Sequence, residues 1–557
     1  TDAFSLQTRG SFDKSFFTYD KRTHAGGDLT FAPGNRGRYI LEKTENTQQY
    51  IDLIGIYNKD LSEDFNLTLT AGTSLTKYKT GDQVLLDSGQ QGLIYSNIFD
   101  IANFEGTRAI SQNVFNREVQ SVFGAANIGY KNMLYLDITG RNDWSSTLAR
   151  TASPSFFYPS VGLTGVLSEM FEMPEAISFA KVRASYAEVG KDLPAYATNP
   201  LGRIVGGVVQ PPAFRFVEGD VLEPEKQKSF EIGTEWRFFN NRLGFDFTYY
   251  NSSTTNQIFI VNAPDDPSGT SKIIVNAGEI TNTGLEIVLN AKPILNDNFN
   301  WNTAVNFAQN KNEVVSLYTD PQSGGQEPFI ITDAGVNGYG YQLVVGEDFG
   351  SITGSSVMRD ANGLPIVSDD GNSTIQKTEK TETIAHAQPD FTLGWNNTFT
   401  YKNWSLNILI DGKFGGDVVS VTEAVNDKFG VSQTTADARN TNGGMINVVD
   451  TNGVASQITA QDYYNQVGGR DGALGEYVYD ATNISLRELA LGYTLPTKSK
   501  YFESINLSLI ANNLFFIYKD APFDPNIASS TGLGLQGVDI YGQPSTRSIG
   551  LNVNINF

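Results

Sequence analysis

Cysteine is absent from the 557-residue chain, and histidine occurs only twice. Without cysteine the protein can form no disulfide framework, and it has no thiol chemistry and no Cys-based metal site. His24 and His386 lie far apart in sequence, and neither stands in a recognisable pattern of metal ligands. No motif pairs a nucleophile with a base. We therefore expect no catalytic residues, no metal and no cofactor.

Positive charge is scarce, since 40 Lys and Arg face 61 Asp and Glu and the net charge is −21. Proteins that bind nucleic acid need clustered Lys and Arg, so we expect no nucleic-acid partner. Charged residues make up 18 % of the chain, below the usual quarter, whereas aromatic residues reach 12 % and glycine 54 residues. This balance suits a β-structure that lies between two different solvents.

The sequence also lacks any run of about 18 apolar residues, which argues against a transmembrane helix. A strand of about 9–11 residues can nevertheless cross a bilayer with every second residue polar. The final stretch, 548–557, alternates in this way, with apolar residues at Ile549, Leu551, Val553, Ile555 and Phe557. This pattern indicates a strand with one apolar face, which fits either a membrane barrel or a soluble sandwich.

The same two-residue period recurs along the chain and predicts about sixteen strands. They are expected near 3–12, 37–57, 65–74, 115–130, 133–143, 155–168, 178–190, 229–239, 243–250, 273–290, 299–315, 391–402, 404–414, 484–496, 505–516 and 546–557.

The connections between these strands alternate between short and long. The long ones are expected at 80–111, 191–226, 316–390, 417–482 and 518–545. Outer-membrane barrels have short periplasmic turns and long extracellular loops, whereas Greek-key sandwiches do not sort their loops in this way. The pattern predicts an all-β fold, a transmembrane antiparallel up-and-down β-barrel.

One strand also argues against a soluble surface adhesin. Trp404, Leu406, Ile408 and Ile410 form a continuous apolar face opposite polar side chains. In lipid, an unpaired strand edge costs several kcal/mol for each backbone group. Either the first strand therefore pairs with the last, or further strands precede this chain.

Seven segments resemble, in order, successive blocks of the SusC/RagA family of TonB-dependent outer-membrane transporters. The sequence GRNDWSS resembles the family's strand-end motif Arg-x-Asp-x-Ser-Ser at Arg141, Asp143, Ser145 and Ser146, with Trp144 where glycine is common. The seven segments are 155–169, 177–192, 222–258, 275–289, 392–416, 484–496 and 512–526.

The resemblance implies that residues 1–557 are the C-terminal part of a 22-strand barrel in the bacterial outer membrane, in contact with its lipid. Its partners would be the N-terminal barrel strands and plug domain, neither found here, TonB acting through that plug, and a SusD-like surface lipoprotein. The implied function is active import of bulky nutrients, oligosaccharides or peptides. The alternative is a passive sixteen-strand porin, complete as given, in which 3–12 pairs with 546–557.

The resemblance also suggests roles for single residues. Phe557 would be the C-terminal signal for outer-membrane assembly. Tyr339, Tyr341, Tyr463 and Tyr464 lie in the long loops and could stack on sugar rings, although packing within the loops is the favoured role for any one of them.

Overall fold

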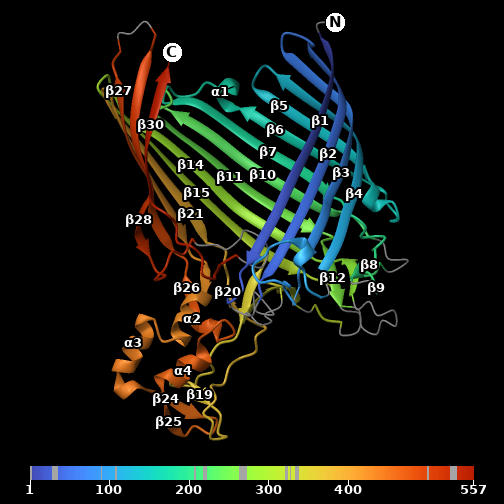
Figure 1. Ribbon diagram of the computed structural model, residues 1–557. Coiled ribbons are helices and arrows are strands. Elements are labelled where there is room, and N and C mark those ends of the chain that lie inside the picture. The colour runs from blue at the N-terminus through green and yellow to red at the C-terminus, as the bar shows by residue number, and fades with distance from the viewer. Residues whose placement is uncertain are drawn as a thin grey trace. The chain divides into compact units, whose positions relative to one another are not determined.

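Figure 1 shows the computed structural model of the chain. It describes residues 3–27, 36–89, 91–106, 109–205, 208–216, 222–262, 272–319, 324–326, 328–332, 338–497, 501–526 and 536–556. Among these residues, no helix combines the length and the apolarity that crossing a membrane requires.

The dominant element is a sixteen-strand sheet in which each strand is hydrogen-bonded to the next one along the chain. This confirms the predicted number of strands and their up-and-down order. The strands are β1 (Phe4–Thr23), β2 (Arg38–Asp60), β3 (Phe65–Asp87), β4 (Ala109–Tyr130), β5 (Leu134–Ser145), β6 (Ser155–Val166), β7 (Ile177–Lys191), β10 (Glu225–Phe238), β11 (Leu243–Thr255), β14 (Glu279–Leu295), β15 (Phe299–Ser316), β21 (Phe391–Tyr401), β22 (Trp404–Phe414), β27 (Asn483–Leu495), β28 (Ser504–Lys519) and β30 (Ser548–Asn556).

The strand order begins with β1 and ends with β30. In the part of the chain that the structure describes, β1 pairs with β2 and β30 pairs with β28. The pairing of 3–12 with 546–557, which the porin alternative requires, is not among the described strand pairs.

The first four strands are longer than the sequence pattern predicted. β1 continues to Thr23 and β3 to Asp87, so the loop expected at 80–111 shrinks to 88–108. Strict apolar alternation stops before these strand ends, where apolar residues become adjacent, as in Phe16 with Phe17 and Leu85 with Leu86. The hydrogen-bonded ladder nevertheless continues. A β-bulge between Thr80 and Gln83 interrupts the β3–β4 pairing without ending it.

The strand expected at 273–290 is instead two strands. β13 (Lys272–Asn276) pairs with β12 (Ile258–Asn262), and β14 begins only at Glu279. Gly278 lies between the two strands and has φ +88°. That backbone conformation would strain any residue with a Cβ, so it favours glycine here. A second small hairpin, β8 (Arg203–Val205) with β9 (Val208–Gln210), lies in the connection after β7.

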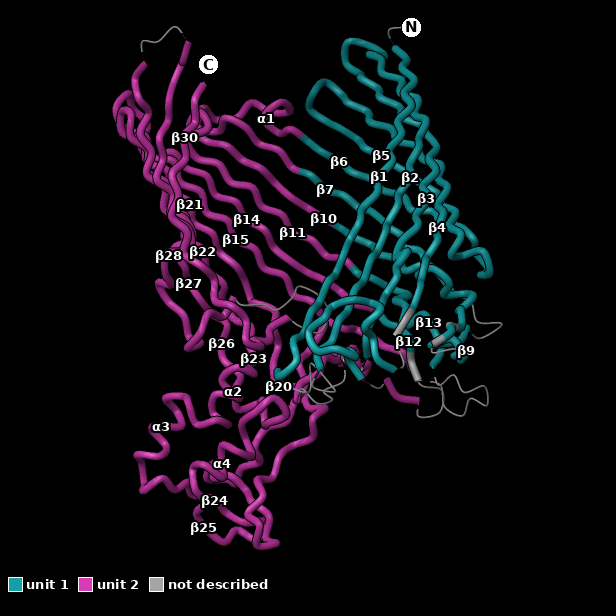
Figure 2. Tube along the Cα trace, in the orientation of Figure 1, with its two compact units in different colours: residues 1–165, 183–230, 253–278 teal, residues 166–182, 231–252, 279–557 magenta. Residues whose placement is uncertain are grey.

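The chain divides into two compact units, shown in Figure 2. Unit 1 comprises 1–165, 183–230 and 253–278, and unit 2 comprises 166–182, 231–252 and 279–557. Unit 1 contains β1–β6, and unit 2 contains the strands from β14 onward.

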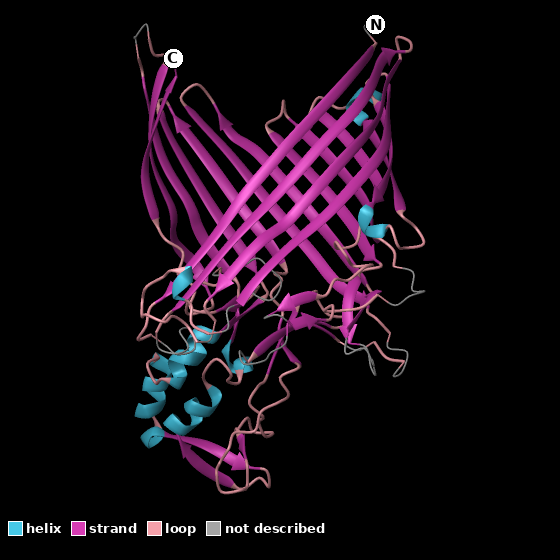
Figure 3. Cartoon of the chain, turned by 45° about the vertical axis from the view of Figure 1, so that its right-hand side comes forward, coloured by secondary structure: helices cyan, strands magenta, loops and turns pink. Residues whose placement is uncertain are grey.

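Within unit 2, the connections expected to be irregular at 316–390 and 417–482 fold around a hydrophobic core of their own. We call this body the loop subdomain, and it includes α2, α3 and α4 (Figure 3). Parallel pairing of β19 with β24 joins the two connections. The subdomain contains β16 (Phe329–Thr332), β17 (Tyr339–Leu343), β18 (Ser351–Gly354), β19 (Ile366–Val367), β20 (Glu382–Ala385), β23 (Asp417–Ser420), α2 (Val421–Lys428), α3 (Gln433–Asn440), β24 (Met445–Asp450), β25 (Ala455–Thr459), α4 (Ala460–Val467) and β26 (Val478–Asp480), with β29 (Val538–Asp539) paired to β23.

Hydroxyl caps begin the three helices of the loop subdomain. The side chains of Ser420, Ser432 and Thr459 each accept a hydrogen bond from a backbone N–H in the first turn. Such caps satisfy donors that have no partner within the helix. The single-turn helix α1 (Leu167–Met170) has no side-chain cap.

The two faces of β1–β4 differ in chemistry. One face exposes large apolar side chains, among them Leu6, Ile51 and Leu53. The opposite face carries polar side chains that are buried, such as Asp52 and Ser121. We call these the apolar face and the polar face. In a membrane barrel the apolar face contacts lipid and the polar face lines the lumen.

Candidate functional site

A row of polar side chains crosses the polar face of unit 1. Asp52 on β2 lies opposite Arg9 on β1 and Ser74 on β3, and Ser74 lies opposite Ser121 on β4. The Arg9 guanidinium donates to Asp52 Oδ2 at 2.6 Å, and the Tyr50 hydroxyl donates to the same oxygen at 2.5 Å. Asp52 is therefore buried with its charge compensated, as a carboxylate removed from water must be.

Arg141 and Asp143 of the strand-end motif continue this row on β5. Arg141 Nε donates to Asp143 Oδ1 at 2.7 Å, and a second guanidinium nitrogen donates to Ser121 Oγ at 2.7 Å. The Tyr158 hydroxyl of β6 donates to Asp143 Oδ2, also at 2.7 Å. The two motif residues point the same way because they are two positions apart on a strand. They connect β4, β5 and β6 through charge-assisted hydrogen bonds.

Ser145 and Ser146, at the end of the motif, have different partners. The Ser145 hydroxyl donates to Asp192, and the Thr147 hydroxyl donates to Asp192 Oδ2 at 3.2 Å. Ser146 Oγ instead accepts a hydrogen bond from the Glu118 backbone N–H at 3.0 Å. The motif thus joins the end of β5 both to β4 and to the residue that follows β7.

Asp192 is the centre of this arrangement, although no motif in the sequence points to it. Arg117 Nε of β4 lies 2.8 Å from Asp192 Oδ2, while Asp192 itself is only 7 % exposed. Asp192 closes the segment 177–192 that resembles a family block, which is the only sequence signal that could have drawn attention to it. Arg117 lies 75 positions earlier in the sequence, so only the fold shows that it pairs with Asp192.

A cavity of about 390 Å³ adjoins Asp192 in unit 1. Both charged and apolar side chains line it. Lys191 Nζ lies 3.0 Å from Glu225 Oε2 at this cavity. The volume lies at the lower end of the range for small-molecule pockets, so it suits one sugar ring or one amino-acid side chain rather than a whole oligomer. The lining residues are Arg117, Val119, Asp143, Phe156, Gly190, Lys191, Asp192, Leu193, Pro194, Glu225 and Ile258.

The four loop tyrosines lie in or against the core of the loop subdomain. Tyr341 is 3 % exposed, its hydroxyl donates to the Gln536 carbonyl at 2.6 Å, and its ring lies edge-on to that of Tyr339. Tyr463 is also buried, in edge contact with Tyr464. Burial raises the pKa of Tyr464 to about 12. The buried rings of Tyr339, Tyr341 and Tyr463 offer no free face to a sugar, which favours packing within the loops, whereas Tyr464 is half-buried.

Two other expectations remain as they were. Phe557 lies outside the described residues. Within the described ranges, no three His, Cys, Asp or Glu side chains are grouped so that they could hold a metal ion.

An up-and-down antiparallel sheet with one apolar face, one polar face, and alternating short turns and long connections defines a class, the outer-membrane β-barrel proteins. Residues 1–411 match the family described as TonB dependent receptor-like, beta-barrel. The chain belongs to this family of TonB-dependent receptors and is an outer-membrane protein.

Several known proteins resemble the chain over most of its length. TonB-dependent receptor P3 of Formosa agariphila is 28 % identical over 96 % of this chain and 53 % of its own length. TonB-dependent receptor SusC of Bacteroides thetaiotaomicron is 23 % identical over 78 % of this chain and 43 % of its own length. The solved RagAB peptide transporter superposes with a TM-score of 0.72 at 18 % identity, covering this whole chain and 60 % of that one. The chain thus spans about half the length of the curated relatives it matches.

Proposed function

We propose that this chain is the barrel of a SusC-like transporter that actively imports bulky nutrients, oligosaccharides or peptides. In this proposal TonB acts through a plug domain, and a SusD-like lipoprotein covers the long connections on the cell surface. The names of two similar proteins, SusC and the RagAB peptide transporter, support this class of function.

The loop subdomain is the observation that carries the proposal. Two connections, 317–390 and 415–482, form one body with its own buried core, which includes Val419, Ile352 and Leu474. A channel for small solutes needs no second hydrophobic core outside its barrel. A receptor that holds a large ligand or a protein partner does need a shaped surface, and long loops with structure of their own are usually functional.

The polar face of unit 1 fits a passage for polar nutrients. It presents buried, compensated charges and the 390 Å³ cavity beside Asp192. A polar substrate loses hydrogen bonds to water when it enters the passage. Fixed hydrogen-bonding groups on the polar face replace those bonds, which an apolar lining could not do.

Uptake measurements test the proposal. Cells that carry the intact gene or a deletion would be given fluorescent oligosaccharides or oligopeptides of five to ten units, with and without a protonophore. We expect uptake that disappears on deletion and also on collapse of the proton gradient. Uptake that persists without the gradient would instead support the passive porin alternative.

Affinity purification tests the partner. The protein, isolated in mild detergent, should retain a surface lipoprotein. Deleting 421–467 within the loop subdomain should release that lipoprotein while the barrel stays in the membrane. Retention of the lipoprotein after this deletion would contradict the proposed docking role.

A further inference from the structure

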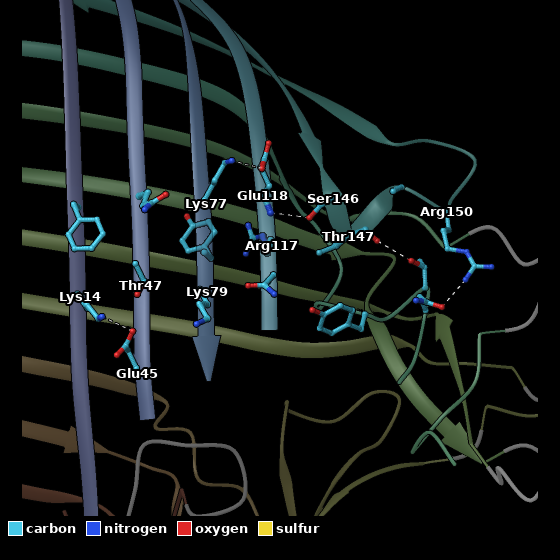
Figure 4. A pocket seen from close by; sticks show the side chains of 18 residues that line it. Lys14, Glu45, Thr47, Lys77, Lys79, Arg117, Glu118, Ser146, Thr147 and Arg150 are labelled. Carbon is cyan, nitrogen blue, oxygen red and sulfur yellow. Dashed lines mark hydrogen bonds and ion pairs between the residues drawn. The ribbon is translucent and has the colours of Figure 1, made fainter. Parts of the chain in front are cut away.

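A groove of about 780 Å³ lies in unit 1, with most of its strand residues on the apolar face, whereas Tyr78 and Arg117 of its lining belong to the polar face. Figure 4 shows the side chains that line it. Its strand residues Phe12, Lys14, Thr47 and Lys77 share one face, because Lys14 pairs with Thr47 and Phe12 with Gln49, which in turn pairs with Lys77. The exposed apolar side chains Leu6, Ile51 and Leu53 belong to that same face.

Loops from the next strands form the other wall of the groove. β5 ends at Ser145, whereas β4 continues outward, so the edge of β4 is flanked by residues 146–150 and 196–199. Ser146 attaches this wall to β4 through the Glu118 N–H, and Arg150 donates to Asn199 Oδ1 at 2.9 Å.

The groove lies at the height where lipid headgroups begin. From Phe4, beside the short β2–β3 turn, to Lys14 the strand rises about 33 Å at ~3.3 Å per residue. A tilt of about 40° reduces this to a height of roughly 25 Å, which equals the apolar band of an outer-membrane barrel. Because the groove lies toward the long connections, it faces the outer leaflet.

Cations outnumber acids in the groove, although the chain as a whole is strongly acidic. Lys14 lies 2.7 Å from Glu45, Lys77 lies 3.3 Å from Glu118, and Lys79 lies 2.6 Å from Asp82 at the margin. Arg117 turns to Asp192 on the other face.

Arg150 differs from these paired cations, because the partner found for it among the described residues is a neutral amide rather than a carboxylate. The ion pairs formed by the lysines are half-exposed and therefore weak, so their ammonium groups can exchange to a stronger anion.

The floor of the groove is apolar and continues into the membrane. Phe12 is 63 % exposed at the floor, and Ile51 and Leu53 extend the same face toward the bilayer centre. A free phosphate or a soluble sugar would use none of this surface. An acylated molecule would use both parts, with its chains on the strand face and its charged headgroup between the lysines and Arg150.

We infer that this groove binds the phosphorylated headgroup of an acylated glycolipid of the outer leaflet. Lys14, Lys77, Lys79 and Arg150 contact the phosphates, and Phe12 with Ile51 contacts the acyl chains. The inference depends on the outer-membrane location and not on the proposed transport activity.

Binding of bisphosphorylated lipid A tests this inference. The protein would be purified from outer membranes in detergent and titrated with lipid A while native mass spectrometry counts bound lipid. The triple variant Lys77→Gln, Lys79→Gln, Arg150→Gln should lose at least about tenfold in affinity, since each Lys or Arg near an anionic surface contributes measurably. Dephosphorylated lipid A and the deacylated, phosphorylated disaccharide should each bind more weakly than intact lipid A.

A matched control removes three cations from the opposite, short-turn end of the strands. The variant Lys59→Gln, Lys131→Gln, Lys402→Gln should leave the affinity for lipid A within about twofold. Arg150→Gln alone provides a variant that cannot disturb the sheet, because Arg150 lies in an exposed loop. Equal loss in the groove and control variants, unchanged affinity in Arg150→Gln and the triple variant, or equal binding of the dephosphorylated lipid would each overturn the inference.

Discussion

The first strands of unit 1 and the loop subdomain of unit 2 place their apolar side chains in opposite ways. On β1, Leu6 is 65 % exposed and Phe12 nearly as much, while Asp52 beside it is buried. In the loop subdomain, Leu474 and Val419 are fully buried, and the carboxylates of Asp427 and Asp539 are buried with them. One chain therefore follows two rules, because lipid surrounds the first region and water the second.

The largest expected effect comes from a cavity in the loop subdomain. Leu474→Ala should destabilise that body by about 2–5 kcal/mol, since the removed atoms leave a void in a packed core. The matched change Leu6→Ala on the lipid-facing side of β1 should cost less than about 1 kcal/mol, because lipid chains refill the space.

Hydrogen exchange across 338–390 and 417–482 would report the first change, and thermal unfolding of the purified protein in detergent the second. Equal losses of stability in the two variants would contradict this difference between the regions. They would mean that the side chains of β1 are packed like those in the core of a water-soluble body.

Asp192→Asn should have the next largest effect. It removes the charge opposite Arg117 and weakens the hydrogen bonds from Ser145 and Thr147. We expect the free energy of local unfolding to fall by about 1–3 kcal/mol. This range is lowered to allow for the partial exposure of Arg117. Faster hydrogen exchange at 192–199 would show it. Asp64→Asn, in the exposed and longer pair with Lys131, serves as the control and should change nothing measurable.

Tyr341→Phe separates packing from substrate contact in the loop subdomain. Losing the hydrogen bond to the Gln536 carbonyl should cost about 0.5–1.5 kcal/mol, and hydrogen exchange near 536–540 should increase. Tyr541→Phe in the same segment, where the ring is half-exposed, should have no such effect. Nutrient uptake should stay unchanged in both variants. A loss of uptake without a loss of protection would restore the stacking role suggested by the sequence.

The strands could be predicted because the alternation of apolar and polar residues within each strand shows which face is apolar. Trp404, Leu406 and Ile408 show the apolar face without any knowledge of the neighbouring strands. The sequence pattern does not predict the outer ends of β1 and β3, because apolar residues are adjacent there, as in Phe16 with Phe17 and Leu85 with Leu86. The two-residue period therefore no longer distinguishes strand from loop.

The loop subdomain and the Asp192 arrangement could not be predicted in this way. Val419 pairs with Val538, and Arg117 meets Asp192, across separations that no local pattern encodes. The four motif residues were found through resemblance, which gave their identity but not their partners. Only the fold shows that Ser145 and Ser146 bind to different elements.

The smallest expected effect is a pH dependence in the loop subdomain. Burial, reinforced by the charges of Asp427 and Asp539, raises the pKa of Glu423 above its ordinary value of about 4.5. The folded subdomain therefore binds the proton more tightly than the unfolded chain, so its stability falls as pH rises through the interval between the two pKa values. Protection of α2 from hydrogen exchange, corrected for the intrinsic rate, should be greater at pH 4.5 than at pH 7.5. Glu423→Gln should flatten this difference, whereas Glu382→Gln, an exposed carboxyl on β20, should not. A steeper pH dependence in Glu423→Gln would show that other carboxylates of the loop subdomain dominate the pH dependence of its stability. Burial of Glu423 would then not be the cause.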